Sequence, residues 1–172
     1  RDDTAKAIKK AAETTYYASH AYNPLFFEGT RSMAYELYEQ MGIPDYVVIP
    51  AGNGTMLLGA YIGFKELGKL PKIIAVQSGN CDPIYRKFKN HPGHQYTEMA
   101  AEGIAIQEPM RIDEIIEAVT DSGGDIITVN DDEVKLAQAM LGEIGIYVEV
   151  TSGAALAGAF KYFKDSYNSE LK

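Results

Sequence analysis

Residues 46–55 of the chain read Tyr46-Val47-Val48-Ile49-Pro50-Ala51-Gly52-Asn53-Gly54-Thr55. The apolar run at the start of this stretch is bounded by Pro44 and Pro50, and it predicts a strand. The glycine-containing segment that follows leads into a helical pattern extending to Leu67. Loops that connect a strand to a helix lie at the carboxyl edge of a parallel α/β sheet, where such sheets bind their ligands. Residues 50–55 are therefore predicted to form a ligand-binding loop.

The composition of this loop is suited to a phosphate group. Gly52 and Gly54 allow a ligand to approach the backbone, and the helix that begins near Thr55 offers free N–H groups and a positive dipole end. Asn53 and Thr55 add side-chain donors. The loop is not a Walker sequence, because it lacks the lysine, and it lacks the third glycine and the ribose carboxylate of a dinucleotide site. A tight turn without a ligand is the alternative interpretation.

A second segment with a similar organisation lies near the end of the chain. Residues 146–150 predict the last strand, and residues 153–164 predict a helix rich in alanine and glycine. Thr151 and Ser152 fall between the two, where a hydroxyl group would come close to a flat ring and hydrogen-bond a pyridine nitrogen. An ordinary helix N-cap is the alternative role for this pair.

The rest of the chain alternates between helical and strand patterns. Helices are predicted over residues 28–41, 83–89 and 113–120, and a further helix capped by Asn130 or Asp131 extends to residue 141. Strands are predicted over residues 72–76 and 125–129. This alternation predicts one α/β domain over residues 1–172, a three-layer sandwich with a mostly parallel sheet and helices on both faces. Residues 91–109 are interpreted as an active-site loop.

Composition excludes several classes of partner and site. The 16 basic and 24 acidic residues give a net charge of −8, which disfavours nucleic acid and anionic membranes as partners, and no apolar stretch approaches the length of a membrane span. The single cysteine, Cys81, fits a reducing compartment such as the cytoplasm and has no partner that would make it a nucleophile. His91 and His94 lack further ligands, so no metal site is predicted.

Several segments, taken in order, resemble one enzyme family. They are Asn23-Pro24 with Glu28-Gly29, residues 44–54, residues 63–68, Pro83-Ile84-Tyr85, Ser122-Gly123-Gly124 with residues 131–133, and residues 145–158. This order resembles the large domain of pyridoxal-phosphate enzymes of fold type II, the tryptophan-synthase-β-like fold. Within that group the segments are most similar to those of the threonine synthase family.

The resemblance implies a cofactor and its binding residues. The cofactor would be pyridoxal 5'-phosphate, with its phosphate on Gly52, Asn53, Gly54 and Thr55, and its pyridine nitrogen on Thr151 or Ser152. The reaction would convert O-phosphohomoserine and water to threonine and phosphate, in a full-length homodimer acting on a small amino-acid substrate. Further donors for a substrate phosphate would be Arg31, Ser32 and Asn23.

The resemblance also has gaps. The family's Schiff-base lysine has no counterpart here, so we expect it to precede Arg1. The chain would then be the C-terminal large part of a two-domain enzyme and hold no catalytic residue itself. Thr30-Arg31-Ser32 and Val150-Thr151 replace the family's usual Gln-Lys-Thr and Pro-Ala. A threonine dehydratase, a cysteate synthase and a non-catalytic module that binds a phosphate ligand therefore stay open as alternatives.

Overall fold

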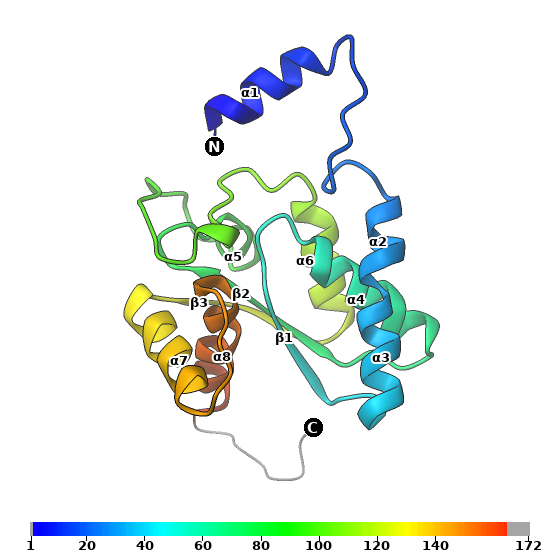
Figure 1. Ribbon diagram of the computed structural model, residues 1–172, viewed down its shortest axis with the longest axis vertical. Coiled ribbons are helices and arrows are strands. Elements are labelled where there is room, and N and C mark those ends of the chain that lie inside the picture. The colour runs from blue at the N-terminus through cyan, green and yellow to red at the C-terminus, as the bar shows by residue number, and fades with distance from the viewer. Residues whose placement is uncertain (1, 165–172) are drawn as a thin grey trace.

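The computed structural model describes residues 2–164 of the chain. Within that range one parallel sheet has three strands in the order β1 (Tyr46–Pro50), β2 (Lys72–Ser78) and β3 (Asp125–Val129). Val48 pairs with Ile74 between the first two strands, and Val76 pairs with Ile127 between the second two. Parallel pairing requires a crossover between successive strands, and helices supply these crossovers in Figure 1.

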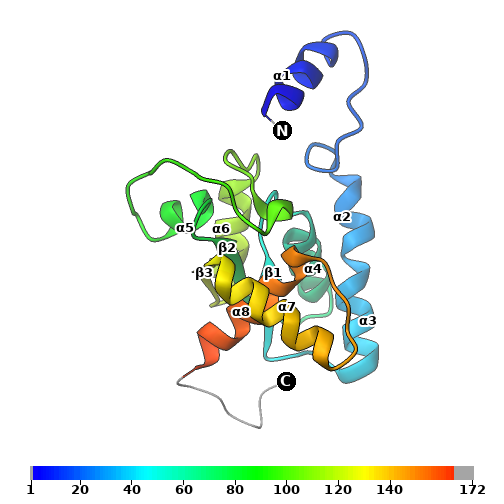
Figure 2. The same cartoon turned by 60° about the vertical axis from the view of Figure 1, so that its left-hand side comes forward.

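Helices cover both faces of the sheet. On one face lie α4 (Thr55–Glu66), α5 (Pro83–Phe88) and α6 (Ile112–Asp121), with α2 (Leu25–Thr30) and α3 (Ser32–Met41) packed outside α4. On the other face lie α7 (Asp131–Glu143) and α8 (Val150–Phe163). The predicted three-layer sandwich is confirmed. Figures 1 and 2 show α1 (Asp2–Ala11) projecting away from this body.

Strand β2 lies between two hydrophobic cores, one on each face of the sheet. Its residues alternate between the faces, so that Ile73 and Ala75 pack with α4 and α6, while Val76 packs with α7 and α8. All three side chains are completely buried. A central parallel strand buried on both faces is expected to be continuously apolar, and the Lys72–Ser78 sequence follows that rule from Ile73 to Val76.

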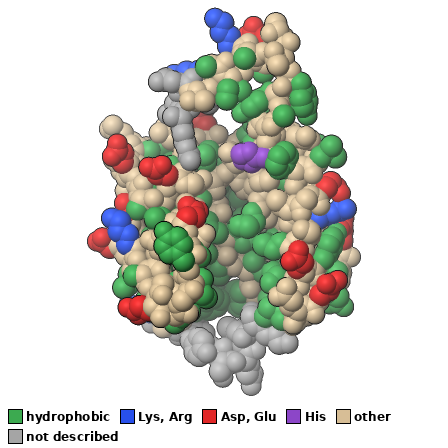
Figure 3. Space-filling view, viewed as in Figure 1, with side chains coloured by type: hydrophobic (Ala, Val, Ile, Leu, Met, Phe, Trp, Pro, Cys, Tyr) green, Lys and Arg blue, Asp and Glu red, His purple; other side chains and the backbone are tan. Residues whose placement is uncertain are grey.

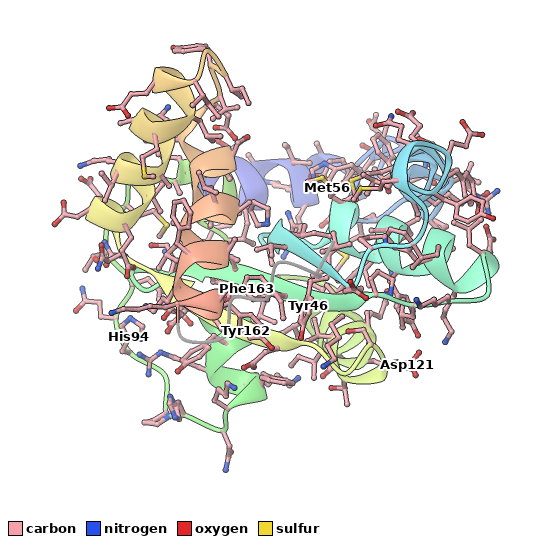
Figure 4. All side chains as sticks on the ribbon, turned by 90° about the horizontal axis from the view of Figure 1, so that it is seen from below. Tyr46, Met56, His94, Asp121, Tyr162 and Phe163 are labelled. Carbon is pink, nitrogen blue, oxygen red and sulfur yellow. The ribbon has the colours of Figure 1, made fainter. Side chains whose placement is uncertain are left out.

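An aromatic cluster fixes the end of α8 on the start of β1. The ring of Phe163 meets Tyr46 edge-on with centroids 4.9 Å apart, and Tyr162 lies 5.9 Å from the same ring. Figure 4 shows these three side chains close together. Lys72 Nζ lies 5.4 Å from the centre of the Tyr46 ring, which adds a cation–π contact. The cluster therefore sets how α8 crosses the sheet.

The helix predicted over residues 28–41 is divided into α2 and α3. The hydroxyl of Thr30 has two alternative acceptors for its single hydrogen, Phe26 O at 3.3 Å and Thr55 O at 3.1 Å. Ser32 Oγ donates to Gly29 O at 2.8 Å. Such back-bonding from serine and threonine competes with the helical ladder and bends helices. The periodicity of the apolar residues carries no sign of this break.

The predicted strand over residues 146–150 is wrong. Residues 146–149 form an irregular segment, and Val150 is already the first residue of α8. Tyr147 is 96% exposed and Ile146 is 48% exposed, so neither side chain enters a sheet. Apolar composition alone does not make a strand, because a strand needs a neighbouring edge with which to hydrogen-bond. On the face of the molecule seen in Figure 3, hydrophobic side chains gather between the α7–α8 pair and α3.

The start of α7 resolves one alternative left by the sequence. Asn130, and not Asp131, is the N-cap: the Glu133 N–H donates to Asn130 Oδ1 at 2.8 Å, and the Asn130 N–H donates to Glu133 Oε2 at 2.7 Å. This reciprocal arrangement is a capping box.

Among residues 2–164, no helix is long and apolar enough to span a bilayer.

An exposed triad ties α6 to α4 and makes stability depend on pH. Lys65 Nζ lies 2.9 Å from Asp121 Oδ2, and the Tyr61 hydroxyl donates to the same oxygen at 2.6 Å. The hydrogen bonds from Tyr61 and then Lys65 lower the pKa of the Asp121 carboxyl. Figure 4 places Asp121 at the edge of the molecule, where solvent screens such a pair, so the effect is small.

Replacing Asp121 with asparagine is therefore expected to lower the free energy of unfolding slightly near neutral pH. A lowered carboxyl pKa contributes stability above the pKa of the unfolded chain, and that contribution disappears as the pH falls through the folded value. Denaturant unfolding of both proteins at about pH 7 and about pH 3 should show the difference shrinking in acid. A difference that stays constant across this range would contradict the pair's contribution.

Candidate functional site

The predicted phosphate loop lies at the carboxyl end of β1, and its base is fixed by a buried side chain. The Ala51 N–H donates to Val76 O at 2.8 Å, and Gln77 Nε2 donates to Ala51 O at 3.2 Å. Gln77 is completely buried, and its Oε1 accepts from the Tyr85 N–H at 2.9 Å. Gln77 thus joins the loop to α5. The sequence gives no sign of this role, because a glutamine at a strand end has no distinctive local pattern.

The loop ends in an unusual helix start. Gly54 is the N-cap of α4 with a φ of 76°, and no side chain caps this helix. Within the described chain, the Thr55 Oγ1 atom is buried and has no hydrogen-bond partner. A buried hydroxyl without a partner is costly unless a ligand satisfies it. The uncapped N-terminus and the free hydroxyl together suit an anion such as a phosphate group.

A cleft of about 970 Å³ opens beside this loop. Asn53 lies on its wall, and the other lining residues come from α1, residues 17–22 with Phe26, and residues 105–110. His20 is among them and meets the ring of Phe26 edge-on at 5.9 Å. Asn53 of the phosphate loop therefore faces a space large enough for a cofactor and a small substrate.

The second predicted segment reaches the loop through a short helix. Thr151 lies in the first turn of α8 and is 9% exposed, whereas Ser152 is exposed. The N–H of Gly103, in the 3₁₀ helix η1 (Glu102–Ile104), donates to Thr151 Oγ1 at 3.1 Å. A Cβ placed on Gly52 would lie 3.3 Å from Gly103 O, so η1 also packs against the phosphate loop.

Of the hydroxyl pair, the structure thus brings Thr151 to the phosphate loop and leaves Ser152 at the surface. The sequence pattern predicts a loop for both Thr151 and Ser152 and gives no sign of η1. A helix of three residues is too short to show a periodic pattern. The one signal available was a glycine inside the long segment of residues 91–109, and that signal does not specify a contact.

The three candidate donors for a substrate phosphate are engaged locally. Arg31 pairs with Glu28 at 2.7 Å and with Glu66 at 2.9 Å. Ser32 Oγ donates to Gly29 O, and Asn23 Oδ1 accepts from the Leu25 N–H at 3.0 Å. The residues that line the cleft do not include these three.

The remaining candidates lie beyond the end of β2. Cys81 is buried, and its neighbour Asp82, which is 3% exposed, accepts from Arg86 Nε at 2.8 Å. His94 Nδ1 lies 3.5 Å from the same carboxylate, and His91 meets the Tyr85 ring edge-on at 5.6 Å. Burial raises the pKa of the nearby Tyr96 hydroxyl. These contacts fasten residues 91–96 to α5.

Comparison with known proteins gives the family. A family-wide sequence model described as "Pyridoxal-phosphate dependent enzyme" matches residues 1–170. The chain belongs to this family. Threonine synthase of Methanocaldococcus jannaschii is 30% identical over 95% of this chain and 44% of that protein, and serine racemase of Mus musculus is 30% identical over 87% and 44%. The solved structure of O-ureido-L-serine synthase has a TM-score of 0.74 at 18% identity, covering 92% of this chain and 48% of that chain, which shows a shared fold.

The comparisons confirm the predicted family and its cofactor, pyridoxal phosphate. The chain spans less than half the length of curated relatives that it matches. The residues present fit the phosphate of this cofactor, because the glycine loop, the uncapped start of α4 and the free Thr55 hydroxyl all offer donors to an anion.

Proposed function

We propose that the protein is a pyridoxal-phosphate-dependent lyase of amino-acid biosynthesis that converts O-phosphohomoserine and water to threonine and phosphate. The observation that carries the proposal is the buried, unpartnered Thr55 hydroxyl at the uncapped start of α4. The similarity of nearly the whole chain to threonine synthases supports the choice of reaction.

Each part of the site has a role in this proposal. Asn53, Thr55 and the first N–H groups of α4 hold the cofactor phosphate, and Gly52 and Gly54 let it approach the backbone. Thr151 donates a hydrogen bond to the pyridine nitrogen, which keeps that nitrogen unprotonated. The cofactor, when bound, supplies an electron sink for carbanion chemistry on the amino acid. The loops of this chain orient the cofactor against the substrate in the cleft.

The proposal assigns the Schiff-base lysine to a part of the protein outside residues 1–172. Within the described chain, Lys87 pairs with Asp113 at 2.6 Å and Lys89 pairs with Asp125 at 2.7 Å, away from the phosphate loop. Lys6 and Lys9 border the cleft from α1, yet both are exposed. Borohydride reduction of the native protein, followed by peptide mass analysis, should locate a pyridoxyl adduct. An adduct on Lys6 or Lys9 would contradict this assignment.

Substrate assays on the full-length protein test the reaction. Release of phosphate from O-phosphohomoserine, together with formation of threonine, is the expected result. Ammonia and a keto acid formed from threonine would favour a dehydratase, and phosphate released from O-phosphoserine with sulfite would favour a cysteate synthase. Cofactor binding without turnover of any of these would favour a non-catalytic module.

Location and assembly are part of the same proposal. We place the enzyme in the cytoplasm as a homodimer of full-length chains, in keeping with its resemblance to threonine synthases. Analytical ultracentrifugation of the full-length protein at several concentrations, with and without pyridoxal phosphate, should give twice the mass of one chain. A mass equal to that of one chain throughout would contradict the dimer.

Replacing Thr55 with valine should separate cofactor binding from stability. The substitution keeps the β-branched shape and removes a hydroxyl that has no partner in the folded chain. The affinity for pyridoxal phosphate should fall about tenfold, because one donor to the phosphate is lost, while the cofactor-free protein stays as stable or gains stability. Absorbance titration and thermal unfolding measure the two quantities.

Thr120→Val is the matched control for this substitution. Its hydroxyl already donates to Ile116 O at 2.7 Å within α6, away from the loop. We expect unchanged cofactor affinity in this variant. Equal affinity in Thr55→Val and the original protein would remove Thr55 from the phosphate site.

A further inference from the structure

Arg111 joins two segments of the chain that line the cleft. It is the N-cap residue of α6, and its side chain is 17% exposed. Arg111 Nε donates to Ala21 O at 2.9 Å, and its Nη2 donates to Tyr22 O at 3.4 Å. Ala21 and Tyr22 line the cleft, and so do residues 105–110, which end directly before Arg111. One guanidinium group therefore connects the two segments.

The guanidinium group is held in place from its other side. Arg111 Nη1 lies 2.9 Å from each carboxylate oxygen of Glu114, in the first turn of α6. Its Cζ lies 4.9 Å from the centre of the Phe27 ring on α2, which is a cation–π contact. Phe27 is 7% exposed and belongs to the hydrophobic core. Because the donors of arginine lie in one rigid plane, these contacts fix the direction in which Nε points.

The turn that Arg111 binds forms part of the cleft wall. The N–H groups of Tyr22 and Asn23 both donate to Ser19 O, at 3.2 Å and 2.9 Å, and the Ala21 N–H donates to Ser19 Oγ at 3.2 Å. Ser19 and His20 also line the cleft. Ala21 is 5% exposed, so loss of the arginine would leave the carbonyl of a buried residue without this donor. That cost favours movement of the turn.

Arg111 acts through these neighbours, since the described residues that line the cleft do not include it. Figure 1 shows the chain before α2 and the start of α6 at the same end of the molecule, above the sheet. The arginine lies between these two elements and contacts both. The distance between the turn of residues 19–23 and the segment of residues 105–110 is therefore set by one side chain.

We propose that Arg111 is a positioning residue for the amino-acid substrate. It holds the turn of residues 19–23 against the segment of residues 105–110, so that the cleft beside Asn53 keeps its shape before the substrate arrives. A preorganised cleft lowers the ordering cost of binding. This inference rests on the proposed function, because it assumes that the amino-acid substrate binds in this cleft. It adds to that function a residue behind the cleft wall.

Steady-state kinetics of the full-length protein with O-phosphohomoserine test the inference. The proteins are the original, Arg111→Lys and Arg111→Met. We expect KM to rise about tenfold in both variants while kcat stays nearly unchanged, because the lost preorganisation weakens binding before the chemical step. The Kd for pyridoxal phosphate should also stay near its original value, since residues 52–55 hold the phosphate by separate contacts. A fall in kcat with KM unchanged would overturn the inference.

The lysine variant separates position from charge. Lysine keeps the positive charge, but its single ammonium group cannot reproduce the planar fork that meets Ala21 O and Glu114 together. If the charge alone attracted the anionic substrate, Arg111→Lys would keep the original KM, and that result would overturn the inference. Arg111→Lys also carries the test if Arg111→Met does not fold.

Arg86→Lys is the matched control. Arg86 Nε donates to the Asp82 carboxylate at 2.8 Å and its Nη1 donates to Pro92 O, so this arginine also joins a carboxylate to a backbone carbonyl. Its side chain is 23% exposed, and the residues that line the cleft include neither Asp82 nor Pro92. The control should lose stability and keep its KM. Equal increases of KM in Arg86→Lys and Arg111→Lys would show a general effect of stability, which would overturn the inference.

Hydrogen exchange of the cofactor-free, full-length protein gives a readout independent of activity. The amides of Tyr22 and Asn23 should exchange about tenfold faster in Arg111→Lys, as expected when one hydrogen bond that holds the turn is lost. The His91 amide, which donates to Arg86 O at 2.8 Å, should exchange faster only in Arg86→Lys. An unchanged rate at Tyr22 and Asn23 in Arg111→Lys would overturn the positioning role.

The two readouts distinguish failure of this inference from failure of the proposed function. If the original protein does not turn over O-phosphohomoserine, the proposed reaction is wrong, and the role of Arg111 toward that substrate falls with it. Faster exchange at Tyr22 and Asn23 would still show that Arg111 holds the cleft wall. If the original protein is active and KM is unchanged in both Arg111 variants, only the positioning role is wrong.

Discussion

Replacing Gly54 with alanine is expected to destabilise the protein and to abolish cofactor binding together. Gly54 has a φ of 76°, and a Cβ there would lie 2.4 Å from Ile115 Cδ1 and 2.5 Å from its Cγ1. The left-handed backbone costs about 1–2 kcal/mol for a residue with a side chain. Overpacking against the fully buried Ile115 adds about 1–3 kcal/mol. Any shift that relieves this contact moves the first N–H groups of α4 away from a bound phosphate.

Two companion variants separate the backbone cost from the cost of overpacking. Gly68 has a φ of 79° with no atom within 4 Å of an added Cβ, so Gly68→Ala should cost only the backbone term and leave cofactor affinity unchanged. Adding Ile115→Ala to Gly54→Ala removes the clashing atoms and should relieve the overpacking, although it opens a cavity. Denaturant unfolding and cofactor titration measure both effects. Equal losses of stability in Gly54→Ala and Gly68→Ala would show that the Ile115 contact has no effect.

Replacing Gly124 with alanine is expected to cause the largest loss of stability. A Cβ on Gly124 would lie 1.9 Å from Ile73 O and 2.7 Å from Ile73 C, which are backbone atoms of the central strand. No rotamer change relieves a clash with backbone, so the start of β3 must separate from β2. The hydrogen bond that the Ile73 N–H donates to Ser122 Oγ at 3.1 Å would be lost as well. We expect a cost of about 4 kcal/mol or more, which lowers Tm by ~10 °C or more.

The neighbouring glycine is the control for this prediction. Gly123 has a φ of 65°, and no atom lies within 4 Å of an added Cβ, so Gly123→Ala should cost only about 1–2 kcal/mol. The two substitutions add the same methyl group at adjacent positions of one turn. Thermal unfolding of both variants therefore compares a backbone clash with a conformational cost alone. A Tm for Gly124→Ala no lower than that for Gly123→Ala would contradict the packing at β2.

The sequence by itself determined the elements whose signals are local. The apolar run between Pro44 and Pro50 predicted β1, and the run that follows Pro71 predicted β2, because strand residues and proline boundaries are read within a few positions. Strand β3 was predicted over the residues that form it. The loop between β1 and α4 was also predictable as a loop, since its glycines and the helix after it are contiguous.

Only the tertiary structure decided features that depend on a partner elsewhere in the chain. Residues 146–150 have the composition of a strand, yet a strand forms only where a sheet edge accepts it, and here α8 begins at Val150 instead. The distinction between Thr151 and Ser152 came from burial and from the Gly103 N–H, which lies on another element. Gln77 and η1 join the site by contacts across the fold. Such contacts leave no local pattern, because the positions that meet are separated along the chain and are brought together only by packing.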